Sequence, residues 1–254
     1  MMPFAEYVAG LKFHTIQPST PSPEWWLRSE TENSTSFELA NLSLPTMEET
    51  IKDRLRHVSC KRMSTLANGA LINYGVACLA PESCYVNVGI WQGFSLLAGM
   101  IGNPDKCCIG VDNFSLALIP AEIESVRARF ETNQSAAHQL WSMDYAEYLT
   151  TIHKQPIGFY FYDGDHNYSH QLRGLQLAER FFTDDCVVMV DDTNWPGPRK
   201  ATLDFLERSP HTYRMLLDSR PHTTAAMQAH PTFWNGIMLF QRVPKDVNGG
   251  DSLQ

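Results

Sequence analysis

The stretch IGFYFYDGD, residues 157–165, joins an uninterrupted apolar run to an acidic turn, and a helical pattern follows it. The same arrangement occurs at four other places: CYVNVG (84–89), CCIGVDN (107–113), HQLWSMD (138–144) and CVVMVDD (186–192). Parallel strands need crossover connections of about a dozen residues or more, and the helical segments between these runs supply them. The pattern therefore predicts an α/β fold built on a doubly wound, largely parallel sheet.

The last part of the chain departs from this alternation. TYRMLLD (212–218) and NGIMLFQRV (235–243) have the pattern of strands, with no convincing helix between them. Without a crossover helix, these two strands are expected to pair as a hairpin, so at least one strand runs antiparallel to the rest. Together with the five earlier runs, they make a predicted sheet of seven strands.

The N-terminal part of the chain has a different pattern. QPSTPSP (17–23) is typical of an extended linker, so the first 25 or so residues are expected to form an arm. Between residues 45 and 80 apolar positions recur at helical spacing, and Thr46 with Glu49 has the pattern of a capping box. The predicted organisation is an N-terminal arm and helical cap (1–80), a core (81–243) and a flexible C-terminal tail (244–254).

Composition narrows the class of protein. The fractions of 43% apolar and 19% charged residues are those of an ordinary soluble globular protein. A net charge of −8 argues against a nucleic-acid partner, which needs clustered Lys and Arg to neutralise phosphates. One group of basic residues is interpreted as a solvated helix face, with a small basic patch as the alternative: Lys52, Arg54, Arg56, Lys61 and Arg62.

Neither a membrane span nor secretion is indicated. No window reaches the roughly 18 to 20 consecutive apolar residues of a span, and the N-terminus MMPFAEYVAGLKF lacks a targeting pattern. The six cysteines show neither a CxxC pair nor the spacing of a disulfide framework. We therefore expect a cytoplasmic protein without a membrane partner. The oligomeric state stays open, a homo-oligomer included.

The polar residues of interest follow the predicted strands, where ligands bind in an open α/β sheet. Gly89 and Gly93 lie between the first strand and its helix, where they serve either a close backbone approach to a ligand or only a tight turn. Asp112 ends the second strand, about 20 residues on, as expected of an acid that binds ribose hydroxyls, although a lone Asp also caps helices. Asp144 ends the third strand, and a helix cap there, completed by Glu147, is compatible with a position near an adenine.

An acidic cluster is predicted where the fourth and fifth strands end side by side. Asp163 follows one strand and the pair Asp191 and Asp192 follows the other. Three neighbouring carboxylates raise one another's pKa unless a cation neutralises them, and such oxygen ligands favour Mg²⁺, Ca²⁺ or Mn²⁺ over zinc. The alternative is that these acids cap the following helices. Asp165 and His166 lie just beyond and are candidate catalytic bases, although a lone His more often makes a structural hydrogen bond.

These motifs resemble those of a known family. GIWQGFS, YDGDHNYSH and VMVDDTNWPGPRKATLDFL, in this order, look like class I S-adenosylmethionine-dependent methyltransferases, most of all the macrocin-type and sugar O-methyltransferases that act on small molecules. The resemblance covers about residues 80 to 243. It implies a Rossmann-like sheet with strand order 3-2-1-4-5-7-6, in which strand 7 is antiparallel. The cofactor S-adenosylmethionine would lie over the first three strand ends.

The resemblance also implies roles for single residues. Asn87 occupies a position where many relatives carry an acid that holds the amino group of the cofactor. The implied cofactor contacts are Asn87, Gly89, Gly93, Ser95, Asp112, Asp144 and Asp163. The implied magnesium ligands are Asp163, Asp191 and Asp192, and Asp165 is the implied base, with His166 as a second candidate.

The predicted function is Mg²⁺-assisted O-methylation of a small hydroxylated metabolite. The metal would lower the pKa of the acceptor hydroxyl, and the fold would align that oxygen with the methyl group of the cofactor. The acceptor pocket is expected from TNWPGPRK (193–200), which contains Trp195, and from the N-terminal helices. The alternatives are a metal-independent methyltransferase and a non-catalytic nucleoside-binding protein of the same fold.

Overall fold

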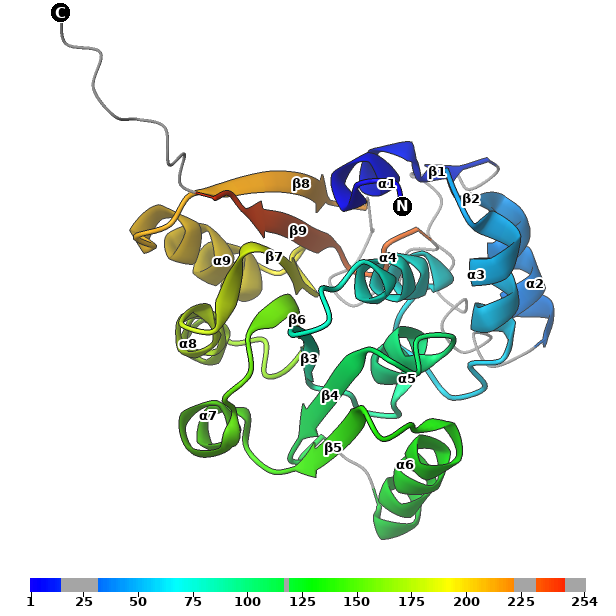
Figure 1. Ribbon diagram of the computed structural model, residues 1–254, viewed down its shortest axis with the longest axis horizontal. Helices are drawn as coiled ribbons and strands as arrows, with labels where there is room; N and C mark the ends of the chain where they lie inside the picture. The colour runs from blue at the N-terminus through cyan, green and yellow to red at the C-terminus, as the bar shows by residue number, and fades with distance from the viewer. Residues whose placement is uncertain (15–31, 117–118, 222–231, 245–254) are drawn as a thin grey trace, which may run out of the picture.

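The computed structural model describes residues 1–14, 32–116, 119–221 and 232–244. The main strands are β3 Cys84–Val88, β4 Cys107–Asp112, β5 His138–Ser142, β6 Ile157–Tyr162, β7 Phe182–Val190, β8 Tyr213–Ser219 and β9 Ile237–Arg242. They form one sheet in the order β5-β4-β3-β6-β7-β9-β8, in which β9 is antiparallel to β7 and β8 (Figure 1). The predicted Rossmann-like sheet of seven strands and its strand order are confirmed. The predicted linker at 17–23 and residues 245–254 of the predicted tail lie outside the described residues.

Helices cover both faces of the sheet (Figure 1). The helices are α1 Phe4–Gly10, α2 Glu32–Asn41, α3 Glu48–Arg56, α4 Leu66–Ala77, α5 Phe94–Met100, α6 Pro120–Asn133, α7 Tyr145–Glu147, α8 Tyr168–Glu179 and α9 Pro196–Arg208. A π-helical turn, Tyr148–Ile152, follows α7, and a small hairpin pairs β1 Lys12–Phe13 with β2 Leu42–Ser43. Side chains from α1 to α6 form the core on one face, and α7, α8 and α9 contribute to the core on the other.

Strand β6 shows why the apolar runs are uninterrupted. Phe159 and Phe161 pack into the core on one face of the sheet, while Tyr160 and Tyr162 pack into the core on the other. Each of the four is at most 1% exposed. A strand covered on both faces needs apolar side chains at every position, so the usual alternation of polar and apolar residues disappears.

The N-terminal helices pack on the same core as the sheet. The rings of Tyr7 in α1 and Tyr74 in α4 stack with centroids 3.9 Å apart, and both residues are fully buried. The predicted capping box at Thr46 is wrong: α3 begins at Glu48, and its N-cap is Met47, which has a left-handed φ of 52° and makes no side-chain cap hydrogen bond. Within the described ranges, no helix combines the length and apolar character needed to cross a bilayer.

Candidate functional site

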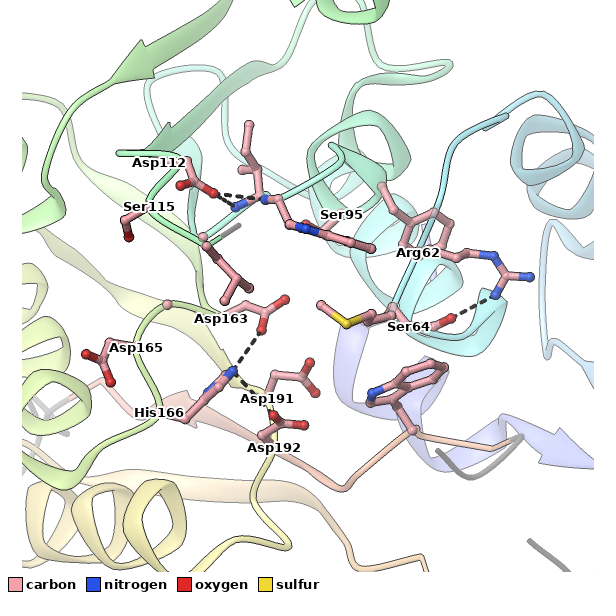
Figure 2. Close-up of a pocket in the computed structure, with 18 of the residues that line it drawn as sticks. Arg62, Ser64, Ser95, Asp112, Ser115, Asp163, Asp165, His166, Asp191 and Asp192 are labelled. Atoms are coloured by element: carbon pink, nitrogen blue, oxygen red, sulfur yellow. Dashed lines mark hydrogen bonds and ion pairs between the residues drawn. The ribbon is translucent and has the colours of Figure 1, made fainter. Parts of the chain in front are cut away.

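A cavity of about 700 Å³ lies at the carboxyl ends of the central strands (Figure 2). The loops after β3, β4, β6 and β7 form one side, and the segment 61–64, between α3 and α4, forms another. The predicted site residues in its wall are Gly89, Ser95, Asp112, Asp163, Asp165, His166, Asp191 and Asp192. The structure therefore brings most of the predicted residues to one place, in a cavity of a size common for small-molecule sites.

The loop between β3 and α5, residues 89–93, is called the glycine loop, and both of its glycines have left-handed backbones. Gly89 has a φ of 76°, and a Cβ there would lie 1.9 Å from the carbonyl oxygen of Asp163. Gly93, with a φ of 97°, is the N-cap of α5. Both positions therefore need glycine for the backbone itself, and the glycine at 89 lets the loops after β3 and β6 approach each other closely.

Asp112 ties the ends of β3 and β4 together. Its Oδ2 accepts hydrogen bonds from the backbone N–H groups of Ile90 (2.8 Å) and Trp91 (2.9 Å), and its Oδ1 accepts from Phe114 N–H (2.6 Å). A carboxylate offers about four acceptor positions, so, counting bonds from the described residues, about one is left for a ligand. The residue predicted to bind ribose thus also fixes the glycine loop.

Three other predicted cofactor residues have distinct positions. Asn87 is fully buried, its amide nitrogen donates to Gly89 O at 3.1 Å, and it is not part of the cavity wall formed by the described residues. Ser95 is in that wall, in the first turn of α5. Asp144 caps α7, because its Oδ1 accepts from the backbone N–H groups of Ala146 (2.8 Å) and Glu147 (3.2 Å). The predicted cap at Asp144 is confirmed, while the cofactor contacts stay predictions.

The acidic cluster forms as predicted from neighbouring strand ends. Backbone hydrogen bonds from Asp163 N to Val88 O (2.8 Å) and from Asp191 N to Tyr162 O (3.2 Å) align the ends of β3, β6 and β7. The carboxyl groups of Asp163 and Asp191 are close enough to form a hydrogen bond when one of them carries a proton. The alternative role as helix caps is wrong, since the N-caps of α8 and α9 are Asn167 and Trp195.

Burial sets the electrostatics of this cluster. Desolvation raises the pKa of Asp191 well above its ordinary value, and the nearby carboxylate of Asp192 raises it further. Desolvation also raises the pKa of Asp163, with Asp191 as the next cause. Asp191 is only 3% exposed, whereas the side chain of Asp163 keeps 29% of its surface accessible at the cavity. Desolvation of the carboxylate is therefore more complete for Asp191 than for Asp163. At least one proton or cation is therefore needed to hold the carboxylates together.

The two candidate bases differ in orientation. His166 points into the cluster, with its Nε2 3.3 Å from Asp192 Oδ2 and 3.9 Å from Asp163 Oδ1 (Figure 2). The exposed Asp165 is turned away from Asp163 and Asp191, and its Oδ1 accepts from Asn167 N at 2.9 Å (Figure 2). The geometry thus places His166 beside the carboxylates.

The side chains of the acidic cluster are of the type that binds a hard cation. Three carboxylates supply oxygen donors, and Oδ1 of the buried Asp191 has no hydrogen-bond partner among the described residues. The arrangement is not a closed cage, because no group of three or more His, Cys, Asp or Glu side chains in the described part of the chain has metal-binding geometry. An ion would therefore need these side chains to rotate toward it, and metal binding stays a prediction.

The interpretation of the basic residues was partly wrong. Arg62 is only 4% exposed and lies outside the helices, where its Nη2 pairs with the buried Glu38 and its Nη1 donates to Ser64 O at 2.8 Å. Lys52 is also buried, at 8% exposure, beside Glu48. The pair of Arg62 and Glu38 holds the segment that walls the cavity opposite the acidic cluster (Figure 2).

Sequence reasoning missed two residues near the cluster. Trp234 lies in the cavity wall, and the buried Asn235 is hydrogen-bonded to Asp192. Both precede β9 and lie more than 40 residues from the acidic pair along the chain. The only sequence signal was the short NG at 235–236, which has the pattern of a turn.

Comparisons with known proteins agree with this geometry. Residues 86–193 match a family model described as a methyltransferase domain. A search of curated proteins found no match.

Several solved structures share the fold. The cofactor-bound Rv0187 from MTB is 16% identical, with 89% of this chain and 100% of that chain covered and a TM-score of 0.56. A protein from Corynebacterium glutamicum is 9% identical, with coverage of 87% and 97% and a TM-score of 0.56. The domain match covers the glycine loop and both acidic motifs, and the strand order is the one that the resemblance implied. Residues 86–193 are therefore similar to a methyltransferase domain, and the sheet around them has the strand order of the class I S-adenosylmethionine-dependent methyltransferases that the motifs resemble.

Proposed function

We propose that this enzyme methylates a hydroxyl group of a small molecule and that Mg²⁺ assists the reaction. The observation that carries the proposal is the convergence of Asp163, Asp191, Asp192 and His166 in the wall of a cavity that the glycine loop also lines. A proton-accepting, cation-holding cluster beside a methyl-donor site suits an acceptor that must lose a proton, as a hydroxyl does.

The glycine loop and Asp112 are proposed to hold the cofactor. S-adenosylmethionine supplies the methyl group on its sulfonium. Asp112 keeps the loop in place through its hydrogen bonds to Ile90 and Trp91, and its remaining acceptor position would receive a ribose hydroxyl. Ser95, in the wall beside the loop, would contact the methionine part.

The acidic cluster is proposed to hold the metal and orient the acceptor. Asp163, Asp191 and Asp192 would ligate Mg²⁺, which, when bound, would lower the pKa of the acceptor hydroxyl. These carboxylates come from rigid strand ends, so the acceptor would be held in a fixed direction relative to the glycine loop. Alignment of this kind supplies a large part of the rate in group transfer.

His166 is proposed as the base, with Asp165 as the second candidate. Nε2 of His166 faces Oδ2 of Asp192 at 3.3 Å, so the imidazole is held at the acidic cluster, where the acceptor hydroxyl is proposed to bind. The ring of Trp195 packs edge-on against His166, with centroids 5.4 Å apart, and limits its rotation. A drop in the maximal rate for His166→Asn that exceeds the drop for Asp165→Asn supports this assignment, and the reverse order transfers the role to Asp165.

The acceptor is proposed to bind between the acidic cluster and the segment 61–64. Met63, Trp195 and Trp234 give this part of the cavity an apolar surface. Large aromatic side chains with a polar edge suit a flat or ring-shaped molecule that carries hydroxyl groups.

The test is methyl transfer from radiolabelled S-adenosylmethionine to a panel of small phenols and sugars, with Mg²⁺ and with EDTA. Transfer that requires Mg²⁺ and is lost in Asp191→Asn supports the proposal. Asp185→Asn is the matched control, because Asp185 lies in the same strand β7, exposed, at the end away from the cavity.

A metal-independent reaction is the second candidate function. The observation in its favour is the absence of a closed metal cage among the described residues. In that case His166 and the carboxylates would act through proton transfer alone. Methyl transfer that survives EDTA while His166→Asn abolishes it would select this candidate.

A further inference from the structure

The loop after β7 and the turn before β9 stay paired beyond the ends of their strands. The β7–β9 ladder ends at Val190 and Met238. Beyond it, Thr193 N donates to Gly236 O (3.2 Å) and Asn194 N donates to Asn235 O (3.0 Å). The approach is close, since a Cβ on Gly236, where φ is 90°, would lie 2.8 Å from Asn194 Oδ1. The turn is therefore fixed against the loop that carries the acidic pair.

Asp192 has a backbone conformation that needs support. Its φ is 54°, in the left-handed region that residues with a Cβ seldom adopt. Its carbonyl oxygen accepts from Trp195 N at 2.9 Å, and its carboxylate receives a hydrogen bond from the side chain of Asn235. Contacts from both the loop and the turn thus hold Asp192 in place.

Asn235 is buried where it contacts Asp192. It is 3% exposed, and its Oδ1 has no hydrogen-bond partner among the described residues. The amide is therefore oriented through its nitrogen, toward Asp192. The carboxylate of Asp192 also faces Nε2 of His166 at 3.3 Å, so Asp192 connects Asn235 in the turn to His166 in the cavity wall.

We propose that Asn235 is a positioning residue that orients the carboxylate of Asp192 and thereby sets the affinity of the acidic cluster for a divalent cation. This inference rests on the proposed function, in which Asp163, Asp191 and Asp192 hold Mg²⁺. Outside partners of metal ligands fix the direction of the ligand oxygens, and their loss costs about 10- to 100-fold in metal affinity.

The experiment measures Mn²⁺ binding to the full chain in the presence of S-adenosylhomocysteine, from the loss of the free-ion signal in electron paramagnetic resonance. Asn235→Ala removes the donor, and Asn235→Asp removes it while keeping the size of the side chain. Asn194→Ala is the matched control, because Asn194 belongs to the same paired loops and its amide donates to Pro221 O at 2.9 Å.

We expect Asn235→Ala to bind Mn²⁺ about 10-fold or more weakly than the wild type. Asn235→Asp is expected to lose affinity in the same direction. Binding of S-adenosylhomocysteine, measured by calorimetry, should stay within about twofold in both, because Asn235 contacts neither the glycine loop after β3 nor Asp112 at the end of β4, which are proposed to hold the cofactor. Asn194→Ala should bind Mn²⁺ as the wild type does.

Two results would overturn the inference, and they differ in meaning. Wild-type affinity for Mn²⁺ in both Asn235 variants removes the positioning role and leaves the proposed metal site intact. No Mn²⁺ binding by the wild type removes the metal site and the inference with it. If Asn235→Ala also loses the cofactor analogue, the variant is misfolded, and Asn235→Asp then decides the question.

Discussion

Replacing Asp191 with Asn should stabilise the metal-free enzyme while removing its activity. Desolvation and the neighbouring Asp192 raise the pKa of the Asp191 carboxyl from its ordinary 3.8, so its charged form is costly in the folded state. Asn is neutral at every pH, and its amide can donate to Asp163 in place of the proton that the two carboxylates share. The variant therefore loses a repulsive charge without losing the contact.

The sign and size of the effect follow from proton linkage. Above 3.8 and up to the raised pKa, the folded protein binds more protons than the unfolded chain, so stability falls as pH rises. For one proton the slope is about 1.4 kcal/mol per pH unit. At about 2 to 4 °C per kcal/mol for a chain of this size, the melting temperature changes by roughly 3 to 5 °C per pH unit.

The assay is thermal unfolding in EDTA between about pH 5 and pH 8, as the difference between Asp191→Asn and the wild type. A difference is needed because burial lowers the pKa of His138 and His153, which gives the opposite slope near 6.5. The advantage of the variant should grow with pH, and added Mg²⁺ should stabilise only the wild type. A variant that is less stable than the wild type at pH 8 would refute the reasoning.

Three further substitutions test other contacts. Gly89→Ala should destabilise the fold by about 2 kcal/mol or more in urea unfolding, because the added Cβ would clash with Asp163 O. Wild-type stability of this variant would show that the loops after β3 and β6 can separate. Asp112→Asn should weaken S-adenosylmethionine binding by about 10-fold in calorimetry, since hydrogen bonds to a charged group contribute about 1.5 to 3 kcal/mol; unchanged affinity would contradict its role in the loop. Glu38→Gln should destabilise the fold by about 3 kcal/mol because Arg62 keeps its buried charge without a charged partner. Adding Arg62→Met to this variant should recover part of the lost stability. Equal stability of the single and double variants would rule out an unpaired charge as the cause.

The seven strands of the sheet could be predicted from the sequence because each is marked by a local apolar pattern and because parallel strands need crossover connections. The apolar run in β6 is buried on both faces, and such a run between helical segments is typical of a central strand in a parallel sheet. The missing crossover before the last strand predicted the antiparallel pair. The position of β9 between β7 and β8 came from the resemblance alone, since two strands joined as a hairpin fit a sheet edge in either order.

The site was predictable only where its residues follow a strand directly. Asp163 and Asp191 end neighbouring parallel strands, so strand adjacency brings them together. Asn235 reaches Asp192 through an antiparallel pairing, and its register depends on the whole sheet. The burial of Arg62 depends on Glu38, a partner 24 residues away that no local pattern marks.

The strand order also has a consequence for synthesis on the ribosome. Because β9 lies between β7 and β8, β8 leaves the ribosome before the strand that joins it to the sheet. Until residues 237–242 emerge, the backbone groups on the open edge of β7 have no strand to pair with. The turn at 233–236 arrives just ahead of β9, so Asp192 reaches its final conformation only after residues 235 and 236 have been made. A nascent chain arrested before residue 235 should therefore have its glycine loop but an incomplete acidic cluster.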